Sequence, residues 1–449
     1  MKNYYSTANI NFAEIEKEAA KLLQELFPLC RSLSGDGVRK TYDVLKNVTD
    51  FNLTEIPSGK KVFSWTIPPE WNIKDAFIAD KEKIKIVDFK NSNLHVINYS
   101  IPIDTMITGK ELKPHLFTLP ELPEAIPYRT TYYKRDWGFC LCYKDYQKIN
   151  DSEIYRVKID SALTKGSMTM GDYIVRGTSK KEFLITAYSC HPSMANDCIS
   201  GVIIWILLLK ILKNCALKNS YRFVIGPETI GAIAYIHEHH RALKHVSGGF
   251  VTTTAGGTGK VGYKKSFNDT SEVDRATREA LVKLNGEILS YPFSLQGSDE
   301  RQYSAPGLRI PTVTITKDKY YEYKEYHTSL DNLDFVTSSQ LMETFSVYVR
   351  VIQYLEQNVT YKSRTPYCEP HLGSLGLYPT TGGAINPTND KSDTGTITTD
   401  DIKAMTWILF YGDGKHDLLN IAQLTGIPFE SIYLNYRRLE KHSLLQETR

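Results

Sequence analysis

The sequence has little of several features that mark particular classes of protein. The formal net charge is only +3 over 449 residues, so charge by itself does not favour nucleic acid or an anionic membrane as a partner. The seven cysteines follow no regular spacing, which is typical of a reducing compartment and not of a disulfide framework. The first twenty residues lack the apolar segment of a signal peptide. The longest apolar run, residues 202–209, is well short of the roughly 20 residues that span a bilayer.

What remains is the composition of an ordinary globular protein. Hydrophobic residues make up 41% and charged residues 23% of the chain, which argues against a disordered protein. The length allows about two or three domains. Together with the absences above, this composition predicts a folded cytoplasmic protein with no nucleic-acid partner and no membrane partner.

The first part of the chain predicts two helices followed by short strands. Apolar residues recur at helical spacing over residues 12–29, and a second helix is predicted in "SGDGVRKTYDVLKNV" after a Ser/Gly/Asp turn. Short extended runs such as "KVFSWTI", "KIKIVDF" and "LHVINYS" then follow, separated by Pro, Gly, Asn and Asp. We therefore predict a mostly β domain over residues 56–159.

Strands and helices alternate from residue 182 onward. The strand patterns "EFLITAY", "YRFVIG" and "IPTVTIT" are separated by helical patterns, and a last helix is predicted over residues 338–357. This alternation predicts an α/β domain with a mostly parallel sheet that is flanked by helices on both faces. Residues 1–55 and 160–375 are predicted to form this discontinuous domain, with the β-rich domain inserted into it.

The last part of the chain predicts a small helical domain. Residues 376–400 are mainly polar and are predicted to be a linker. Residues 401–449 hold three short amphipathic helical patterns, with "TGIP" as a tight turn between two of them. This pattern is typical of a helix-turn-helix, and the tail is expected to complete a winged helix.

Four residues with reactive side chains follow predicted strands of the α/β domain. His191 and Asp197 follow "EFLITAY", Glu228 follows "YRFVIG", and His327 follows the last strand. In open parallel sheets, functional groups gather beyond the carboxyl ends of the strands. Two imidazoles and a carboxylate can supply the three protein ligands of a catalytic zinc, and a further glutamate can accept a proton from water. Each residue alone also has a structural interpretation, such as helix capping by Asp197, but the shared location of all four favours a zinc site.

Longer motifs resemble a known family. The order of His191, Asp197, "PETIG" and "HTSLDNLD" resembles the zinc aminopeptidase family that also contains glutaminyl cyclases. The stretches "RSLSGDGVRKT", "SCHPSMANDCISG", "GSDERQYSAPG", "LGLYP" and "YGDGKHDLLNIA" are similar to a bacterial aminopeptidase-like subfamily. Members of that subfamily carry a β insertion and a C-terminal winged helix, and many are encoded with surface-polysaccharide genes. The resemblance covers nearly the whole chain.

The resemblance implies roles for these four residues. His191, Asp197 and His327 match metal ligands of the family, and Glu228 matches its general base. Two positions differ from the family pattern, because Thr229 stands where a second glutamate is a ligand and "FVTTT" offers threonine where a later acidic ligand is expected. Each metal of a two-zinc site would thereby lose one carboxylate. We therefore expect one zinc ion per chain.

Further residues are candidates for substrate binding. Asp299 and Arg301 lie in "GSDERQY" before the last strand. Arg301 can bind a substrate carboxylate or phosphate, and Asp299 can hydrogen-bond a ligating histidine. Arg129 and Tyr133 lie in the insertion, where they can line the cleft. The alternatives are an internal salt-bridge cluster for the first pair and an ordinary aromatic sheet face for the second.

The leading hypothesis is a zinc-dependent hydrolase of an amide bond in a small peptide or an amide-bearing sugar. One alternative is a metal-stabilised binding or scaffold protein for envelope assembly, without catalysis. Another is a winged-helix DNA-binding regulator. From residue 403 to 449, however, six basic residues are opposed by five acidic ones, which is too little net charge for several phosphate contacts. We therefore expect the C-terminal domain to contact protein, with a homo-oligomer as one outcome.

Overall fold

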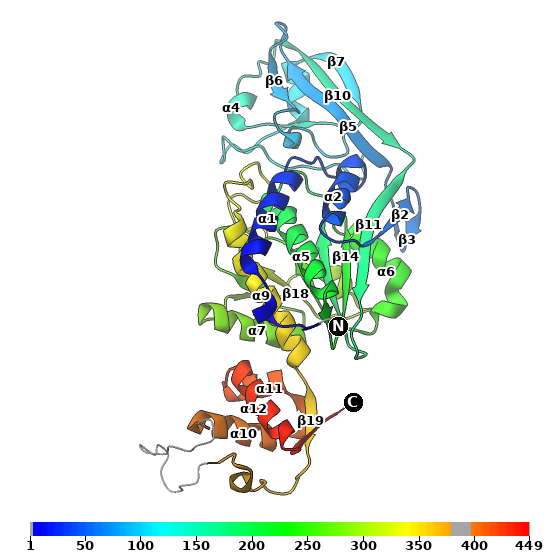
Figure 1. The fold of residues 1–449 in the computed structure, drawn as a ribbon. Coiled ribbons are helices and arrows are strands. Elements are labelled where there is room, and N and C mark those ends of the chain that lie inside the picture. Colours follow the sequence, from blue (N-terminus) through cyan, green and yellow to red (C-terminus); the bar gives the residue numbers. More distant parts are fainter. Residues whose placement is uncertain (1–2, 379–396, 449) are drawn as a thin grey trace. The chain divides into compact units, whose positions relative to one another are not determined.

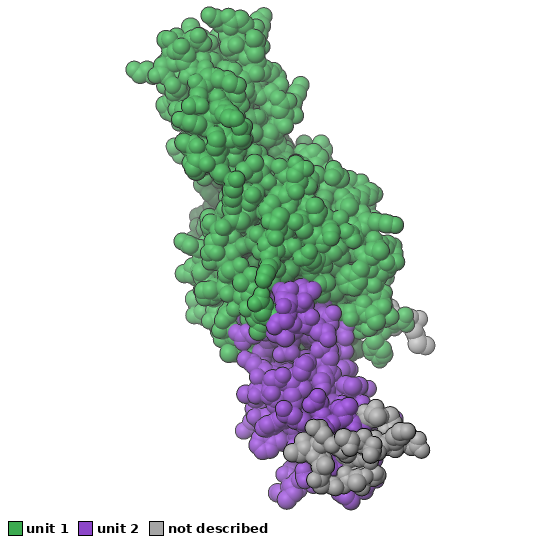
Figure 2. Space-filling model, turned by 90° about the vertical axis from the view of Figure 1, so that its left-hand side faces the viewer, with its two compact units in different colours: residues 1–271, 287–349 green, residues 272–286, 350–449 purple. Residues whose placement is uncertain are grey.

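A computed structural model describes residues 3–378 and 397–448 of the chain. The chain divides into two compact units, which Figure 2 distinguishes by colour. The first unit comprises residues 1–271 and 287–349, and the second comprises residues 272–286 and 350–449. Most of the predicted linker, residues 376–400, lies outside the described residues.

The first unit is built on a mixed sheet of eight strands. Its four central strands form parallel pairs, whereas the next strand on either side is antiparallel to them. The predicted α/β fold is thus confirmed, with a parallel centre and mixed edges. In spatial order the strands are β17 (Ser290–Tyr291), β16 (Gly262–Lys264), β18 (Thr312–Thr316), β15 (Val246–Thr252), β12 (Glu182–Tyr188), β14 (Ser220–Gly226), β11 (Ser167–Val175) and β2 (Asn52–Pro57).

Helices cover both faces of this sheet (Figure 1). Trp205 packs on Phe223 of β14, whereas the neighbouring Arg222 donates a hydrogen bond to Tyr235. Because successive strand residues point to opposite faces, the helices that carry Trp205 and Tyr235 lie on opposite faces. These helices are α5 (Gly201–Lys213) and α6 (Ile230–Leu243), and the unit also contains α1 (Phe12–Leu26), α2 (Asp36–Lys46), α8 (Glu300–Tyr303) and the first part of α9 (Ser338–Gln357).

The core of the first unit lies around α5 and the central strands. All seven residues of β12 and of β14 are buried, and α5 is buried from Gly201 to Leu209. A helix that is apolar all round is buried, and each buried Leu or Ile contributes about 1.5–3 kcal/mol by leaving water. The helical segment Ala195–Lys213 is long and apolar enough to cross a membrane, but 89% of it is buried inside the protein, as in a core helix.

The inserted segment forms a separate antiparallel sheet, which is drawn beyond the main sheet in Figure 1. Its long strand β10 (Ile154–Thr164) leads directly into β11 of the main sheet. Its other strands are β5 (Glu70–Ala79), β6 (Lys85–Asp88) and β7 (Ile103–Thr108), and shorter elements are α3 (Gly109–Leu112), β8 (Leu116–Phe117), β9 (Phe139–Cys140) and α4 (Tyr143–Tyr146). The segment is accordingly rich in strands, as its sequence predicts.

Two of the predicted extended runs differ in the structure. "KVFSWTI" is not one strand but a hairpin of β3 (Lys61–Val62) and β4 (Trp65–Thr66), in which Val62 pairs with Trp65. The chain reverses because Phe63 adopts a positive φ of 51°, in a turn that lacks the usual Gly or Asn. "LHVINYS" begins in a short 3-10 helix, Asn93–His95, because Ser92 caps that turn through its side chain.

The second unit contains the predicted winged helix. Its helices are α7 (Glu272–Asn285), α10 (Thr399–Phe410), α11 (Leu418–Thr425) and α12 (Phe429–Lys441). Its sheet places β19 (Thr360–Ser363) between β20 (Asp413–Asp417) and β21 (Leu445–Glu447). The predicted boundary at residue 401 therefore falls inside this unit, since β19 precedes it in the chain.

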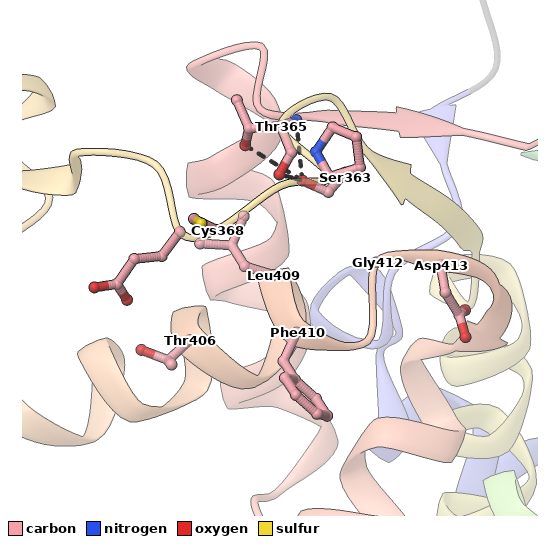
Figure 3. A pocket seen from close by; sticks show the side chains of 10 residues that line it. Ser363, Thr365, Cys368, Thr406, Leu409, Phe410, Gly412 and Asp413 are labelled. Carbon is pink, nitrogen blue, oxygen red and sulfur yellow. Dashed lines mark hydrogen bonds between the residues drawn. The ribbon is translucent and has the colours of Figure 1, made fainter.

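A pocket of about 530 Å³ lies in the second unit, where β19 and α10 end (Figure 3). Its lining includes Cys368, Leu409 and the ring of Phe410. The charged residues of the lining are the acids Glu369 and Asp413. Such a lining does not favour an anionic ligand such as a nucleic-acid phosphate.

Candidate metal centre

The carboxyl ends of β12 and β14 bring His191 and Glu228 together. The two strands are parallel neighbours, and Tyr188 at the end of one pairs with Gly226 at the end of the other. His191 follows three residues later and Glu228 two residues later, so that His191 Nε2 lies 3.7 Å from Glu228 Oε2. The buried Arg31 donates from Nε to the carbonyl of His191 at 3.0 Å and thereby fixes this loop.

Asp197 lies in an irregular turn before α5. The segment Ala195–Ser200 has π-helical hydrogen bonding, but Asp197 and Cys198 depart from helical φ and ψ. Asp331 holds this turn, since its carboxylate accepts hydrogen bonds from the backbone nitrogens of Asn196 at 2.5 Å and of Asp197 at 2.9 Å. Asp197 does not cap α5, whose N-cap is Ser200. Its carboxylate is therefore available for another role.

His327 completes a group of three possible metal ligands. One ligand atom from each of His191, Asp197 and His327 lies within 4.8 Å of the others. His327 Nε2 is 2.9 Å from Asp197 Oδ2, yet this buried nitrogen has no hydrogen-bond partner among the described residues. Buried polar atoms are rarely left without a partner. An unpartnered imidazole nitrogen this close to a carboxylate oxygen fits a cation held between them, so the donor set suits a zinc ion.

The protonation states of two of these groups also suit a metal. Burial lowers the pKa of His191 to about 4, so its imidazole is neutral at pH 7. Burial by itself raises the pKa of Asp197, but the adjacent His191 and His327 imidazoles and the Tyr188 hydroxyl outweigh it and hold this pKa at about 2. A neutral imidazole and an ionised carboxylate are the forms that ligate metals.

Tyr188 hydrogen-bonds the other carboxylate oxygen of Asp197. Its hydroxyl donates to Asp197 Oδ1 and lies 2.6 Å from Thr253 Oγ1. Thr253 belongs to "FVTTT", in which the family pattern has an acidic ligand. The carboxylate of Asp197 therefore faces His327 with one oxygen and a tyrosine with the other, an arrangement that does not favour a bridge between two metals.

Thr229 and the loop around Asp299 lie next to Glu228. Thr229 has a positive φ of 63°, which is uncommon for a β-branched residue. Its N–H donates to Asp299 Oδ1 at 2.7 Å, and Arg301 Nη2 donates to its hydroxyl at 3.4 Å. Asp299 thus binds the backbone beside Glu228, whereas the sequence suggested a bond to a ligating histidine. Arg301 lies close enough to attract the Glu228 carboxylate.

Glu228 sits among other acids. Burial and the nearby Asp299 and Asp197 carboxylates raise the pKa of Glu228 well above its usual value. Burial also raises the pKa of Asp299 to about 7. The side chain of Glu228 remains 25% exposed, so solvent reaches it. A carboxyl group with a raised pKa and access to water is suited to proton transfer near neutral pH.

The insertion contributes Tyr128 to the site. Its ring centroid lies 5.1 Å from that of His191 and 5.2 Å from that of His327, and its N–H donates to the carbonyl of His327 at 2.8 Å. Arg129 and Tyr133, which the sequence suggested, are both exposed, and Tyr133 packs on Trp65 instead. Tyr128 is the first residue of the same "YRTTYY" stretch, but its contacts arise only from tertiary folding.

Sequence reasoning also missed Asp331, although it lies in the quoted "HTSLDNLD" stretch. We expect Asp331→Asn to weaken zinc binding about 10- to 100-fold, because the new amide would place an NH₂ group against the N–H of Asn196 or Asp197. Competition with a chelator measures this change. The exposed Asp334→Asn serves as the matched control. An unchanged zinc affinity in a folded Asp331→Asn protein would contradict the assigned positioning role.

Comparisons with known proteins identify the family and the fold of the chain. Residues 20–358 match a family described as a domain of unknown function (DUF4910), and residues 359–447 match a winged helix-turn-helix family. A relative from Clostridium acetobutylicum, named as a polysaccharide biosynthesis protein with an aminopeptidase-like domain, is 40% identical over 94% of both chains. A candidate peptidase from the same organism has a crystal structure that covers 98% of both chains at 38% identity, with a TM-score of 0.88.

A more distant structure extends the similarity of the fold. The zinc aminopeptidase of Bacillus subtilis covers 77% of this chain and 95% of its own, with 12% identity and a TM-score of 0.55. At that identity the likeness concerns the fold alone. The chain therefore belongs to the DUF4910 family, in which an aminopeptidase-like α/β fold is joined here to a C-terminal winged helix.

Proposed function

We propose that the protein is a zinc-dependent hydrolase of an amide bond. The observation that carries this proposal is the buried, unpartnered Nε2 of His327, 2.9 Å from Asp197 Oδ2, in a group that also contains His191. His191, Asp197 and His327 would hold the ion. When bound there, zinc would lower the pKa of a coordinated water and polarise the carbonyl of the amide.

Glu228 is the proposed general base. It lies beside His191 and is partly exposed, so it can accept a proton from the attacking water. Its raised pKa brings proton uptake and release closer to neutral pH, which lets the same carboxyl return the proton to the leaving amine. Arg301 donates a hydrogen bond to Thr229, the residue that follows Glu228. Its guanidinium is therefore placed to bind an anionic group of the substrate.

The substrate proposed is a small peptide or an amide-bearing sugar. The aminopeptidase-like fold supports the first class, and the name of the Clostridium acetobutylicum relative supports the second. The test is hydrolysis of a panel of peptide amides and N-acyl sugars by the full chain, before and after zinc removal. Release of amine that depends on zinc supports the proposal. A protein that binds zinc and cleaves no amide of the panel would instead be the non-catalytic binding or scaffold protein.

We expect one tightly held zinc ion per chain. Asp197 Oδ1 is engaged by Tyr188, and Thr229 and Thr253 offer only hydroxyl groups where the family pattern has carboxylates. Neutral hydroxyls are poor zinc ligands beside imidazole and carboxylate. Metal analysis of the dialysed protein should therefore give one equivalent. Two equivalents that survive dialysis would refute this stoichiometry.

A further inference from the structure

Three exposed aromatic side chains lie on or against the hairpin of β3 and β4. Phe63 is 57% exposed, Trp65 39% and Tyr133 58%, and the Trp65 and Tyr133 ring centroids lie 5.8 Å apart at an angle of 67°. We call Phe63, Trp65 and Tyr133 the aromatic patch. Isolated exposed apolar residues are common, but adjacent exposed aromatic rings indicate a binding surface.

The aromatic patch is connected to the metal centre from two sides. Tyr133 follows Tyr132, whose hydroxyl lies 2.8 Å from that of Tyr128, the residue that packs on both histidines. On the other side, Phe63 packs on His237 of α6 with ring centroids 5.0 Å apart. His237 is seven residues after the start of α6, which is about 10 Å at 1.5 Å per residue. Glu228 lies just before that start, so the contact of Phe63 on α6 is about two helical turns from Glu228, a span that an oligomeric ligand can bridge.

The hairpin is built to present its rings. The buried Val62 holds the hairpin to the protein, and Lys60 also lies 2.7 Å from Glu238 of α6 in an ion pair. Phe63 occupies a turn position with a positive φ, which a non-glycine residue adopts at an energetic cost. An aromatic residue held exposed at such a position is an observation that points to function.

The surroundings of the patch favour a sugar over an apolar side chain. The exposed hairpin residues beside Phe63 and Trp65 are Lys61, Ser64 and Thr66, whereas the aliphatic Val62 and Ile67 are buried. The surface therefore combines the faces of aromatic rings with hydrogen-bonding groups beside them. The aliphatic side chains of the hairpin do not contribute to it. A pyranose ring has a face of C–H groups and a rim of hydroxyls, and positively polarised C–H groups pack well on the negative face of an aromatic ring.

We propose that the aromatic patch binds a sugar ring of the substrate, so that the amide cleaved at Glu228 belongs to a saccharide. This inference deepens the proposed function. The statement that the amide is cleaved at Glu228 rests on that proposed function. The sugar-binding part stands on the patch alone, because binding can be measured without turnover.

The test is binding of the trisaccharide of N-acetylglucosamine to the full chain, by calorimetry. Trp65→Ala and Tyr133→Ala should each weaken binding about tenfold or more, the range expected when one stacking ring is removed. Trp65→Phe should keep most of the affinity because it restores a ring. Tyr367→Ala removes an aromatic residue that is 90% exposed in the second unit and serves as the matched control. All variants should keep their zinc, since none of these side chains is among the proposed ligands.

The outcomes separate this inference from the proposed function. If Trp65→Ala and Tyr133→Ala lose trisaccharide affinity while no amide is cleaved by any form, the sugar site stands and the hydrolase proposal fails. If the trisaccharide does not bind, or binds both variants as tightly as the unchanged protein, the sugar site is refuted. If the two variants instead lose affinity for trileucine and the trisaccharide never binds, the patch is a peptide subsite and the inference is overturned.

Discussion

Glu228→Gln is expected to lower the rate of amide hydrolysis by about two to four orders of magnitude, the usual contribution of general base catalysis. Glutamine has nearly the size of glutamate but cannot accept the proton of the attacking water. Because Glu228 is not in the group of His191, Asp197 and His327, the variant should keep its zinc. Steady-state kinetics with the best amide of the panel, together with metal analysis of the same preparation, measures both effects.

The matched control for this experiment is Glu287→Gln, which alters a surface carboxylate that pairs with Lys260 at 3.1 Å. Its rate should remain that of the unchanged protein, because an exposed ion pair contributes little. Loss of zinc together with activity in Glu228→Gln would show that Glu228 is a ligand. The assignment of Glu228 as the base would then be wrong.

His327→Ala should remove zinc almost completely, with a fall in affinity of at least about 100-fold. Loss of outer-shell partners alone costs about 10- to 100-fold, and His327 is proposed to bind the ion directly. The loss should also lower thermal stability, since a metal that binds only the folded state stabilises it. Metal analysis and thermal unfolding with and without added zinc test both statements, and added zinc should raise the melting temperature of the unchanged protein but not that of His327→Ala.

His416→Ala provides the control, because His416 lies in the second unit, where it pairs with Asp413 at the surface. It should retain one zinc equivalent and the same response to added zinc. A His327→Ala protein that still holds one equivalent after dialysis would exclude His327 as a ligand. The unpartnered Nε2 of His327 would then need another explanation.

Elements with strong apolar patterns could be predicted from the sequence. The helix predicted over residues 338–357 is found as Ser338–Gln357, and "EFLITAY" is found as the strand Glu182–Tyr188. In these elements the hydrophobic period and the burial agree, so local and tertiary preferences favour the same structure. The hairpin at Phe63 could not be predicted, because its turn lacks the glycine or asparagine that such a turn usually contains.

Part of the candidate site could likewise be predicted from the sequence, and part could not. The order of His191, Asp197, Glu228 and His327 after their strands was enough to predict one location, because strand ends of a parallel sheet meet at one edge. Other contacts of the site join distant segments. Asp331 binds the backbone of Asp197, 134 residues away, and the ring of Tyr128 packs on His191, which lies in another part of the chain. No local pattern encodes such contacts.

The sequence by itself determined the α/β class, the β-rich insertion, the winged helix and the set of candidate metal ligands, because each depends on local periodicity or on residue type. The tertiary structure alone decided how these residues are used. It turned Asp197 away from capping α5, directed Asp299 to the backbone of Thr229, and placed Tyr128 instead of Tyr133 beside the histidines. These contacts depend on which distant segments pack together. Side chains of the same type look alike in the sequence, and only packing decides which of them reaches the site.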